Sequence, residues 1–345
     1  MIKRSLRRLR RIVRRPRNRA GLRGLILLYH SVAELRSDPW SLGVRPRHFG
    51  EHLEVLRRYT HPLNLQQFSQ GLRDGDLPKR SVVVTFDDGY ANNLHEAKPL
   101  LERYGVPATV FVTTGYIGHE REFWWDELDR LLEQPGLLPR VLRLKVDSKT
   151  YCWELGKAAH YHENTTRHPR RWQVRSGSAR VSRHYLYHSL WELLHSLTEG
   201  ERQQVLDQLR ACADAEPAAR STHRPLSSEE LVALAQGELL DIGAHTVTHP
   251  ALAAVPLASQ REEISGSKIR LEEILSRRVS SFSYPHGSLS ADTLGVVREV
   301  GFACACTTFA GVVEGSTDPF RLPRKQVQDW DGTELARRLL RWFDY

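Results

Sequence analysis

Short apolar runs alternate with amphipathic segments along most of the chain. Six runs have the length of buried strands and end in polar residues or glycine; they span residues 25–30, 81–86, 107–114, 239–245, 279–284 and 302–308. Segments with apolar residues at helical spacing lie between them, at residues 45–59, 92–105, 227–236, 259–276 and 290–301. Strands and helices that alternate at such short intervals predict βα units and a parallel sheet or barrel.

This alternation stops between residues 119 and 225. Helical segments are predicted at 119–136 and 189–215, but the stretch between them is polar and rich in His and Arg, and the sequence determines its fold poorly. We therefore expect three parts: a basic tail at 1–23, one barrel domain made of 24–118 and 226–345, and a largely helical insertion at 119–225.

The formal charge of +9 at first favours a nucleic-acid-binding protein. Eleven of the 50 Lys and Arg residues lie within residues 1–24, which contain no Asp or Glu. The rest of the chain then holds 39 basic and 41 acidic residues, so the basicity belongs to the tail and not to the body. Nucleic acid is therefore a disfavoured partner.

Two alternatives remain open for the tail itself. Its apolar residues Ile2, Leu6, Leu9 and Val13 share one helical stripe among arginines, which favours peripheral contact with an anionic membrane. A solvated basic arm fits the same composition. The tail has no apolar stretch long enough for a signal peptide or a membrane span, so we expect a cytoplasmic protein with peripheral contact at the inner membrane face.

Two carboxylates follow the second predicted strand, in the sequence TFDDG at residues 85–89. Asp87 and Asp88 both reach a common site if the backbone turns where the strand ends. Carboxylates this close repel each other, and a bound cation would supply the counter-charge. The alternative is an ordinary acidic turn, because Asp-Gly is common turn sequence.

Two histidines follow the fourth predicted strand, in the sequence HTVTHP at residues 245–250. His245 and His249 are four residues apart, so one helical turn places both imidazoles on the same face. Two imidazoles and one carboxylate are good ligands for a divalent transition metal and leave coordination positions open for water and substrate. A purely structural histidine pair is the alternative for this motif taken alone.

These two motifs, with SYPHG at residues 283–287, resemble the first three motifs of the polysaccharide deacetylases, carbohydrate esterase family 4. The resemblance implies an α/β fold, a distorted and incomplete (β/α) barrel of about seven strands, with its site at the carboxyl ends of the strands. It also implies that Asp87 is the general base and that Asp88, His245 and His249 hold a divalent metal. Zn²⁺ suits these ligands best, with Co²⁺ and Ni²⁺ as alternatives.

Further site residues follow from the same resemblance. The backbone N–H matching His286 would bind the oxyanion, and Tyr284 and Pro285 would shape that turn beside the substrate. The third motif lacks its usual arginine before Tyr-Pro, and Arg324 is a candidate to replace it. Trp124 and its neighbour Trp125 are candidates for stacking on a sugar ring, although packing of the insertion on the barrel is slightly favoured.

The general acid is not found at the sequence position where the family usually has it. The family commonly supplies it from a late Leu-x-His motif, but the chain has no histidine after His286. The sequence LLYH, which ends at His30, resembles the early strand of the poly-N-acetylglucosamine deacetylases, which look circularly permuted. That resemblance makes His30 the proton donor to the leaving amine, because an amide nitrogen is not expelled unprotonated near pH 7. A structural cap on the first strand is the alternative.

The sequence thus predicts a metal-dependent hydrolase of carbon–nitrogen bonds other than peptide bonds. Its substrate would be N-acetylhexosamine in a surface polysaccharide, a glycolipid or a precursor of these. Three alternatives stay open: a carbohydrate O-deacetylase, another amide hydrolase on the same metal site, and a non-catalytic carbohydrate-binding barrel.

Overall fold

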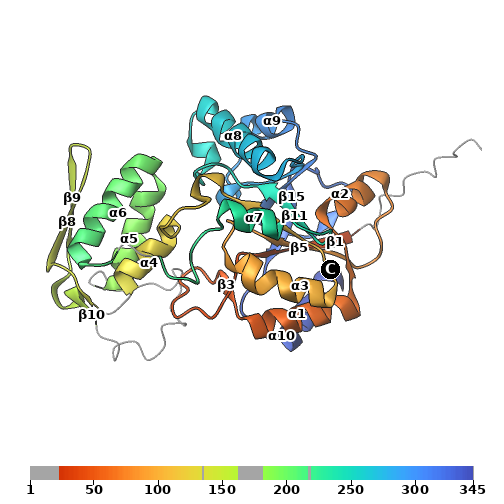
Figure 1. Cartoon of the computed structure of the whole chain (residues 1–345), viewed down its shortest axis with the longest axis horizontal. Helices are drawn as coiled ribbons and strands as arrows, with labels where there is room; N and C mark the ends of the chain where they lie inside the picture. Colours follow the sequence, from red (N-terminus) through yellow and green to blue (C-terminus); the bar gives the residue numbers. More distant parts are fainter. Residues whose placement is uncertain (1–22, 134–135, 162–181, 217–218, 345) are drawn as a thin grey trace, which may run out of the picture.

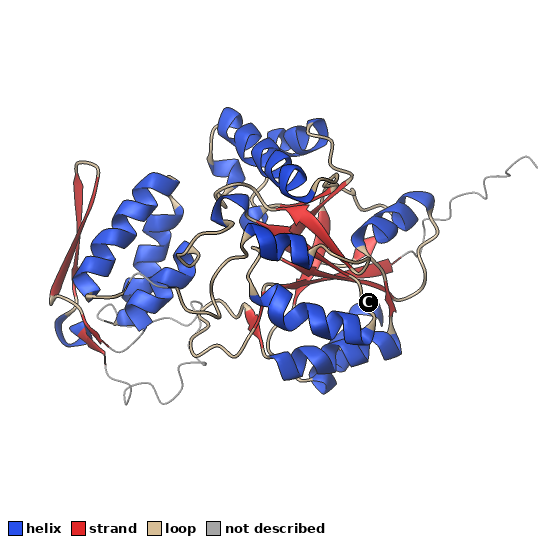
Figure 2. Cartoon of the chain, in the orientation of Figure 1, coloured by secondary structure: helices blue, strands red, loops and turns tan. Residues whose placement is uncertain are grey.

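The computed structural model describes residues 23–133, 136–161, 182–216 and 219–344. Seven parallel strands form a ring at the centre of the larger part of the molecule (Figures 1 and 2). In order around the ring they are β1 (Arg23–Tyr29), β15 (Leu322–Gln326), β13 (Cys304–Ala310), β12 (Ser281–Ser283), β11 (Leu240–Ala244), β6 (Ala108–Val112) and β5 (Ser81–Phe86). β5 pairs with β1 in register from Gly24↔Ser81 to Tyr29↔Phe86, which closes the ring.

The prediction of a distorted, incomplete (β/α) barrel is confirmed, since the ring holds one strand fewer than an eight-stranded barrel. The six strands that the apolar runs predict all lie in this ring. The seventh, β15, was missed, because its sequence LPRKQ contains a proline and two charged residues. Short strands extend or flank the ring: β4 (His61–Pro62), β14 (Val313–Glu314), β2 (Ser31–Val32) and β3 (Gly43–Val44).

Helices cover the outside of the ring (Figure 2). They are α1 (Pro46–Tyr59), α2 (Leu65–Asp74), α3 (Lys98–Tyr104), α7 (Ser228–Leu234), α8 (Leu257–Leu275), α9 (Ala291–Glu299) and α10 (Gly332–Asp344). Single turns add η1 (Asn93–Ala97), η2 (Thr114–Tyr116), η6 (Leu252–Ala254) and η7 (Pro285–Gly287). Several helix starts carry their own caps; in α7, for example, Ser227 and Glu230 form a capping box.

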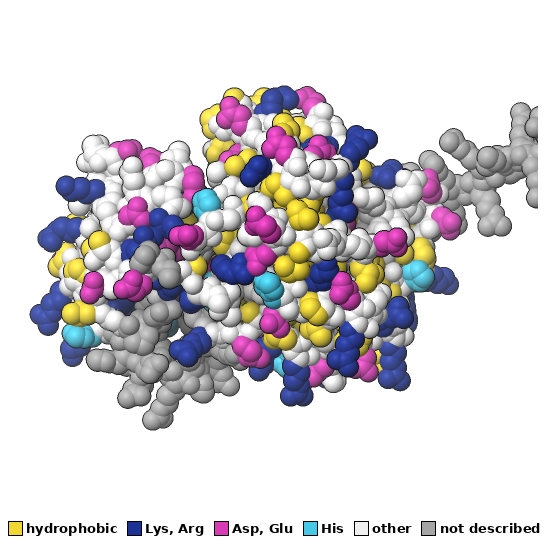
Figure 3. All heavy atoms as spheres, in the orientation of Figure 1, with side chains coloured by type: hydrophobic (Ala, Val, Ile, Leu, Met, Phe, Trp, Pro, Cys, Tyr) yellow, Lys and Arg dark blue, Asp and Glu magenta, His cyan; other side chains and the backbone are white. Residues whose placement is uncertain are grey.

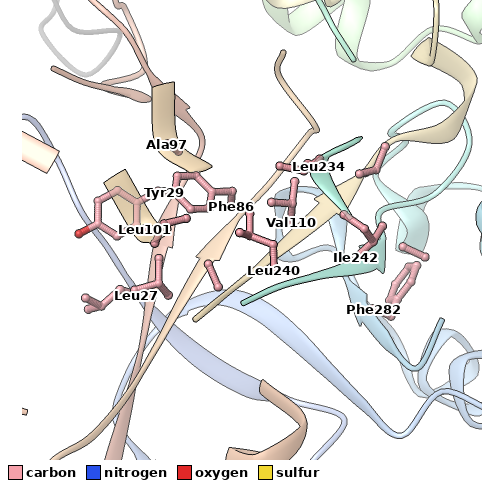
Figure 4. Close-up of a cluster of buried hydrophobic side chains, with 14 of the residues drawn as sticks. Leu27, Tyr29, Phe86, Ala97, Leu101, Val110, Leu234, Leu240, Ile242 and Phe282 are labelled. Atoms are coloured by element: carbon pink, nitrogen blue, oxygen red, sulfur yellow. The ribbon is translucent and has the colours of Figure 1, made fainter. Parts of the chain in front are cut away.

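The barrel core lies between the ring and these helices. Tyr29 and Phe86 from neighbouring strands meet Leu101 of α3, while Ile242 and Phe282 line the next strands round (Figure 4). All are almost fully removed from water. Because both faces of the parallel strands are buried, the strands read as continuous apolar runs rather than as alternating patterns.

The elements between Trp124 and Ala213 form a second body with a core of its own, at the left of Figure 1. It contains three helices and a hairpin: α4 (Trp124–Glu133), α5 (Arg183–His195), α6 (Glu199–Ala213), β8 (Val141–Val146) and β9 (Lys149–Glu154). Shorter elements are β7 (Gly136–Leu137), η3 (Gly156–Ala159) and β10 (His160–Tyr161). The boundaries that we placed at residues 119 and 225 stay a prediction.

The structure adds detail to this segment. The stretch whose fold the sequence leaves undetermined contains the hairpin β8–β9, in which alternate side chains of β8 are buried. The helical prediction at 189–215 corresponds to the end of α5 and to α6, which starts anew because Thr198 caps it together with Glu201.

Buried ion pairs join the two chain segments that lead into and out of the second body and tie them to α4. Arg220 pairs with Glu122 at 2.8 Å and with Asp129 at 3.0 Å. Two hydrogen bonds also tie the segment after β2 to the same body: Ser37 Oγ donates to Asp129, and Trp40 Nε1 donates to the Tyr187 hydroxyl. The second body is therefore held against the barrel by side-chain contacts as well as by its two chain connections.

On the face shown in Figure 3, basic and acidic side chains are interspersed over the body of the molecule. This agrees with the near balance of charges outside the tail. Apart from Arg23, the tail lies outside the described residues. Within the described part of the chain, no helix is both long and apolar enough to cross a membrane.

Candidate active site

A cavity of about 350 Å³ opens at the carboxyl ends of the barrel strands. Six of the predicted site residues line it: His30, Asp87, Asp88, His245, His249 and His286. They come from the ends of β1, β5, β11 and β12, which the ring brings together although they are far apart in sequence. The remaining walls include Trp40, Trp125, Trp191, Gln326 and Gln328.

Asp88, His245 and His249 offer ligand atoms that all lie within 4.8 Å of one another. The Asp88 Oδ1 atom is 3.5 Å from His245 Nε2 and 3.4 Å from His249 Nε2. All three side chains are buried. His245 Nδ1 lies 2.8 Å from the Ser283 carbonyl, to which it donates, so its Nε2 lone pair faces the site. One carboxylate and two imidazoles in this arrangement fit a divalent metal such as Zn²⁺.

The backbone around these side chains is strained. Asp88, Thr246, His249 and His286 all have positive φ, between 57° and 76°, a region that residues other than glycine rarely occupy. Such strain gathers at functional sites because the surrounding fold enforces it. At Asp88 it turns the chain just after β5, so that Asp87 and Asp88 both face the cavity. Gly89, with φ of 89°, completes the turn.

Asp87 is held in a different environment from its neighbour. Arg324 makes two hydrogen bonds to its carboxylate, at 2.7 and 2.6 Å, and Ser283 Oγ donates a third at 3.2 Å. Burial by itself would raise the pKa of Asp87, but the Arg324 charge and hydrogen bonds outweigh it and lower the pKa to about 2. Asp87 is thus an ionised carboxylate at any ordinary assay pH.

His30 follows β1, the strand paired with β5, and lines the same cavity as Asp87. Loss of water around the ring lowers its pKa, while the charges of Asp88 and Asp87 act in the opposite direction. Its carbonyl accepts a hydrogen bond from Asn93, but among the described residues its imidazole makes none. A hydrogen-bonding cap on β1 therefore does not account for this side chain, and its ring is available to a substrate.

Four further predicted site residues are not among those that line this cavity. Arg324 is fully buried and pairs with Asp87 at 2.6 Å; its role as substitute for the arginine missing from the third motif stays a prediction. Tyr284 donates its hydroxyl to the Phe320 carbonyl and Pro285 starts η7, so both lie in the turn that they were expected to shape. Trp124 packs inside the second body, where Arg202 covers its ring.

The neighbour of Trp124 takes the position at the cavity instead. Trp125 lines the wall, with its ring centre 4.7 Å from that of His249. Trp40 and Trp191 face the same space, with ring centres 4.7 Å apart. The sequence motif FWW thus supplies one tryptophan ring to the cavity and one to the core of the second body, because successive residues on a helix point about 100° apart.

His286 lines the cavity next to the cluster of Asp88, His245 and His249. Burial, followed by the nearby His195 and His245, lowers its pKa to about 3, so its ring is neutral. Its ring centre lies 4.6 Å from that of His249. The proposed role of its backbone N–H toward an oxyanion stays a prediction.

Sequence comparison finds similarity between this chain and known polysaccharide deacetylases. Residues 74–138 and 211–305 match the family model for polysaccharide deacetylase. "Putative polysaccharide deacetylase YxkH" of Bacillus subtilis is 32% identical over 110 residues, which are 31% of this chain and 38% of the relative. Poly-beta-1,6-N-acetyl-D-glucosamine N-deacetylase of Staphylococcus aureus is 26% identical over 161 residues, 46% of this chain and 50% of the relative. The matches thus cover half or less of these relatives.

Solved structures share the fold across nearly the whole chain. The Streptococcus pyogenes deacetylase PplD, in complex with acetate, matches with a TM-score of 0.56 and 18% identity over 92% of this chain and 98% of its own. IcaB from Ammonifex degensii matches with a TM-score of 0.57 and 17% identity over 94% and 97%. The family model covers just under half of the chain, and fold and motifs agree with it in their likeness to the polysaccharide deacetylases.

Proposed function

We propose that this protein is a metal-dependent N-deacetylase of N-acetylhexosamine units in a glycan. The observation that carries the proposal is one cavity lined by a carboxylate–histidine–histidine triad, a separate ionised carboxylate and a further histidine. Binding of a sugar alone needs neither a metal triad nor a second carboxylate beside it. A catalytic site therefore explains these residues better than a carbohydrate-binding barrel does.

Asp88, His245 and His249 would hold the metal, for which Zn²⁺ is the preferred ion and Co²⁺ and Ni²⁺ are alternatives. When bound there, a divalent ion supplies Lewis-acid activation of water and of the acetyl carbonyl. Asp87 accepts the proton of the attacking water, and Arg324 keeps that carboxylate ionised and oriented. The backbone N–H of His286 stabilises the negative oxygen that forms on the acetyl carbon.

His30 completes the reaction in this proposal. The amine leaves once its nitrogen is protonated, and the imidazole of His30, which lines the cavity, donates that proton. The products are acetate and a free amino sugar. This assignment places base and acid at the ends of two neighbouring strands, β5 and β1.

The walls of the site support a sugar as substrate. Trp40 and Trp191 offer ring faces on which the C–H side of a pyranose packs, and Gln326 and Gln328 offer amides for its hydroxyl groups. A second cavity of about 270 Å³ adjoins the first, sharing Ser41 and Gln328 with it. The adjoining space favours a unit within a longer glycan over an isolated monosaccharide.

The decisive measurement is acetate release from a panel of N-acetylated oligosaccharides and polysaccharides, with O-acetylated xylan as a comparison. We expect release from N-acetylhexosamine oligomers, loss of activity with a chelator, and recovery with Zn²⁺, Co²⁺ or Ni²⁺. Asp88→Asn should abolish the recovery. Release from O-acetylated xylan alone would favour an O-deacetylase, and glycan binding without any release would favour a binding module.

A further inference from the structure

One ligand of the metal triad lacks the hydrogen bond that usually holds such a residue in place. Metal-binding histidines almost always donate their second ring N–H to a carbonyl, a carboxylate or water, which fixes the ring orientation. His245 does so through Ser283. His249 does not: its Nδ1 atom is buried and has no hydrogen-bond partner within the described part of the chain.

Packing of rings surrounds His249 instead. Its ring centre lies 4.6 Å from that of His286, 4.7 Å from that of Trp125 and 4.9 Å from that of His245. His245 is itself a ligand, and His286 follows β12 of the barrel. Trp125 is the one of the three that comes from the second body, where it stands in the first turn of α4.

The indole of Trp125 is locked in its orientation. Its Nε1 donates to the Tyr90 hydroxyl at 2.9 Å, and that hydroxyl donates to Asp126 Oδ2 at 2.7 Å. The ring of Phe123 stacks on it at 5.0 Å with an interplanar angle of 4°. Because Tyr90 lies two residues after Asp88, this chain of contacts joins the metal triad to α4 by a short route.

The helix that carries Trp125 is also anchored. Arg220 donates to the Asp126 carbonyl at 2.8 Å and pairs with Glu122 and Asp129 on either side. Further along α4, Glu127 pairs with Arg121 and Arg210. Buried pairs of this kind are costly to break, so the helix start has little freedom to shift.

We propose that Trp125 is a positioning residue for the metal ligand His249. Its ring, fixed by Tyr90 and by the anchored start of α4, replaces the missing hydrogen bond and keeps His249 Nε2 directed toward Asp88. The second body is then part of the metal centre and not an appendage of the barrel. This inference rests on the proposed metal-dependent function.

The test measures metal affinity rather than turnover. The dissociation constant of Zn²⁺ is determined for the full-length protein by competition with a chromophoric chelator, for wild type, Trp125→Ala, Trp125→Phe and Tyr90→Phe. We expect Trp125→Ala to weaken binding about 10- to 100-fold, the range found when a partner of a ligating histidine is lost. Trp125→Phe keeps a ring against His249 and should retain most of the affinity, with Tyr90→Phe in between.

Trp153→Ala is the matched control. Trp153 lies on β9 of the same body, and its Nε1 donates to Ser189, so the same volume is removed away from the metal triad. Circular dichroism of the metal-free proteins checks folding; if Trp125→Ala is unfolded, Trp125→Leu and Tyr90→Phe decide. Unchanged affinity in the folded variants, or equal weakening in Trp153→Ala, overturns this inference alone. Absence of Zn²⁺ binding by the wild type overturns the proposed metal-dependent function with it.

Discussion

Two adjacent aspartates carry different chemistry because the chain reverses between them. Asp88 has φ of 76° and faces the two histidines, whereas Asp87 stays in line with β5 and meets Arg324 and Ser283. A metal would neutralise the first carboxylate, and a guanidinium neutralises the second. The electrostatic repulsion expected between the two carboxylates is thus reduced because each carboxylate has its own counter-charge.

Loss of the second counter-charge is testable. Arg324→Met removes the partner of a buried carboxylate, so burial then dominates and the pKa of Asp87 rises from about 2. The acidic limb of the kcat/KM profile should move to higher pH, and the unfolding free energy at neutral pH should fall by about 3–5 kcal/mol. Denaturant unfolding and pH-rate profiles measure the two effects.

The sign follows from linkage. A carboxylate whose folded-state pKa lies below its ordinary value of 3.8 adds stability above that pH and loses it as the pH falls through about 2. Arg321→Met serves as control, since Arg321 is exposed three residues earlier. A variant at Arg324 with the wild-type pH profile would show that the ion pair does not tune Asp87.

A second prediction for a single residue concerns the proton donor His30. His30→Ala should reduce deacetylation about 10²- to 10⁴-fold, because the amine then leaves without a positioned acid. Zn²⁺ affinity should stay unchanged, since His30 is not one of the three clustered ligands. His61→Ala, an exposed histidine on β4, is the control. Near-normal turnover in His30→Ala would remove this residue from the mechanism.

At the scale of elements, β1 is held by more than its pairing with the three strands β5, β14 and β15. The Tyr29 hydroxyl lies 3.2 Å from His52 Nδ1 on α1, and His52 Nε2 lies 2.7 Å from the Trp330 carbonyl just before α10. Since a carbonyl only accepts, Nε2 donates to it and Nδ1 accepts from Tyr29. One buried neutral imidazole thereby joins β1, α1 and the approach to α10.

This junction makes folding stability depend on pH. Burial lowers the pKa of His52 to about 4 from its ordinary 6.5, so the unfolded chain binds a proton first as the pH falls. The unfolding free energy should decrease between pH 6.5 and 4, by about 3 kcal/mol from this group. Urea unfolding across that range should give a shallower loss for His52→Gln. An identical slope in both proteins would rule His52 out as the cause.

Which elements the sequence predicted depended on how each one buries its side chains. Buried parallel strands such as β5 and β6 can be recognised in the sequence as apolar runs because both of their faces are buried. β15 was missed because Arg324 points inward to pair with Asp87, 237 residues earlier in the chain. No local pattern reveals an arginine whose partner lies on another strand. The hairpin β8–β9 was missed because only alternate residues of β8 are buried and most residues of β9 are exposed.

The residues of the candidate site were likewise predictable from the sequence only in part. Short motifs located Asp87, Asp88, His245 and His249, because each motif sits at the end of an apolar strand. The pair of tryptophan rings that lines the cavity was not predictable. Trp40 and Trp191 come together only when the second body packs against the segment that follows β2. Ring contacts between segments 151 residues apart leave no periodic signal in the sequence.

At the scale of the whole molecule, charge is divided between a nearly neutral body and the basic tail. We predict that deletion of residues 1–20 releases the protein from vesicles containing anionic lipid and leaves acetate release from soluble oligosaccharides unchanged. Co-sedimentation at low and high salt measures the binding. Equal sedimentation of both proteins would assign vesicle binding to the body.

The closure of the ring by β1 has a consequence for how the protein is made. β1 pairs with β5, some sixty residues away, and also with β15, about three hundred residues away. Ring closure of such high contact order is slow, and during synthesis it waits until β15 has left the ribosome. Until then the β15-facing edge of β1 is unpaired. The strand β15, which carries Arg324, is thus the last to be secured, so in a nascent chain Asp87 is made long before the arginine that pairs with it.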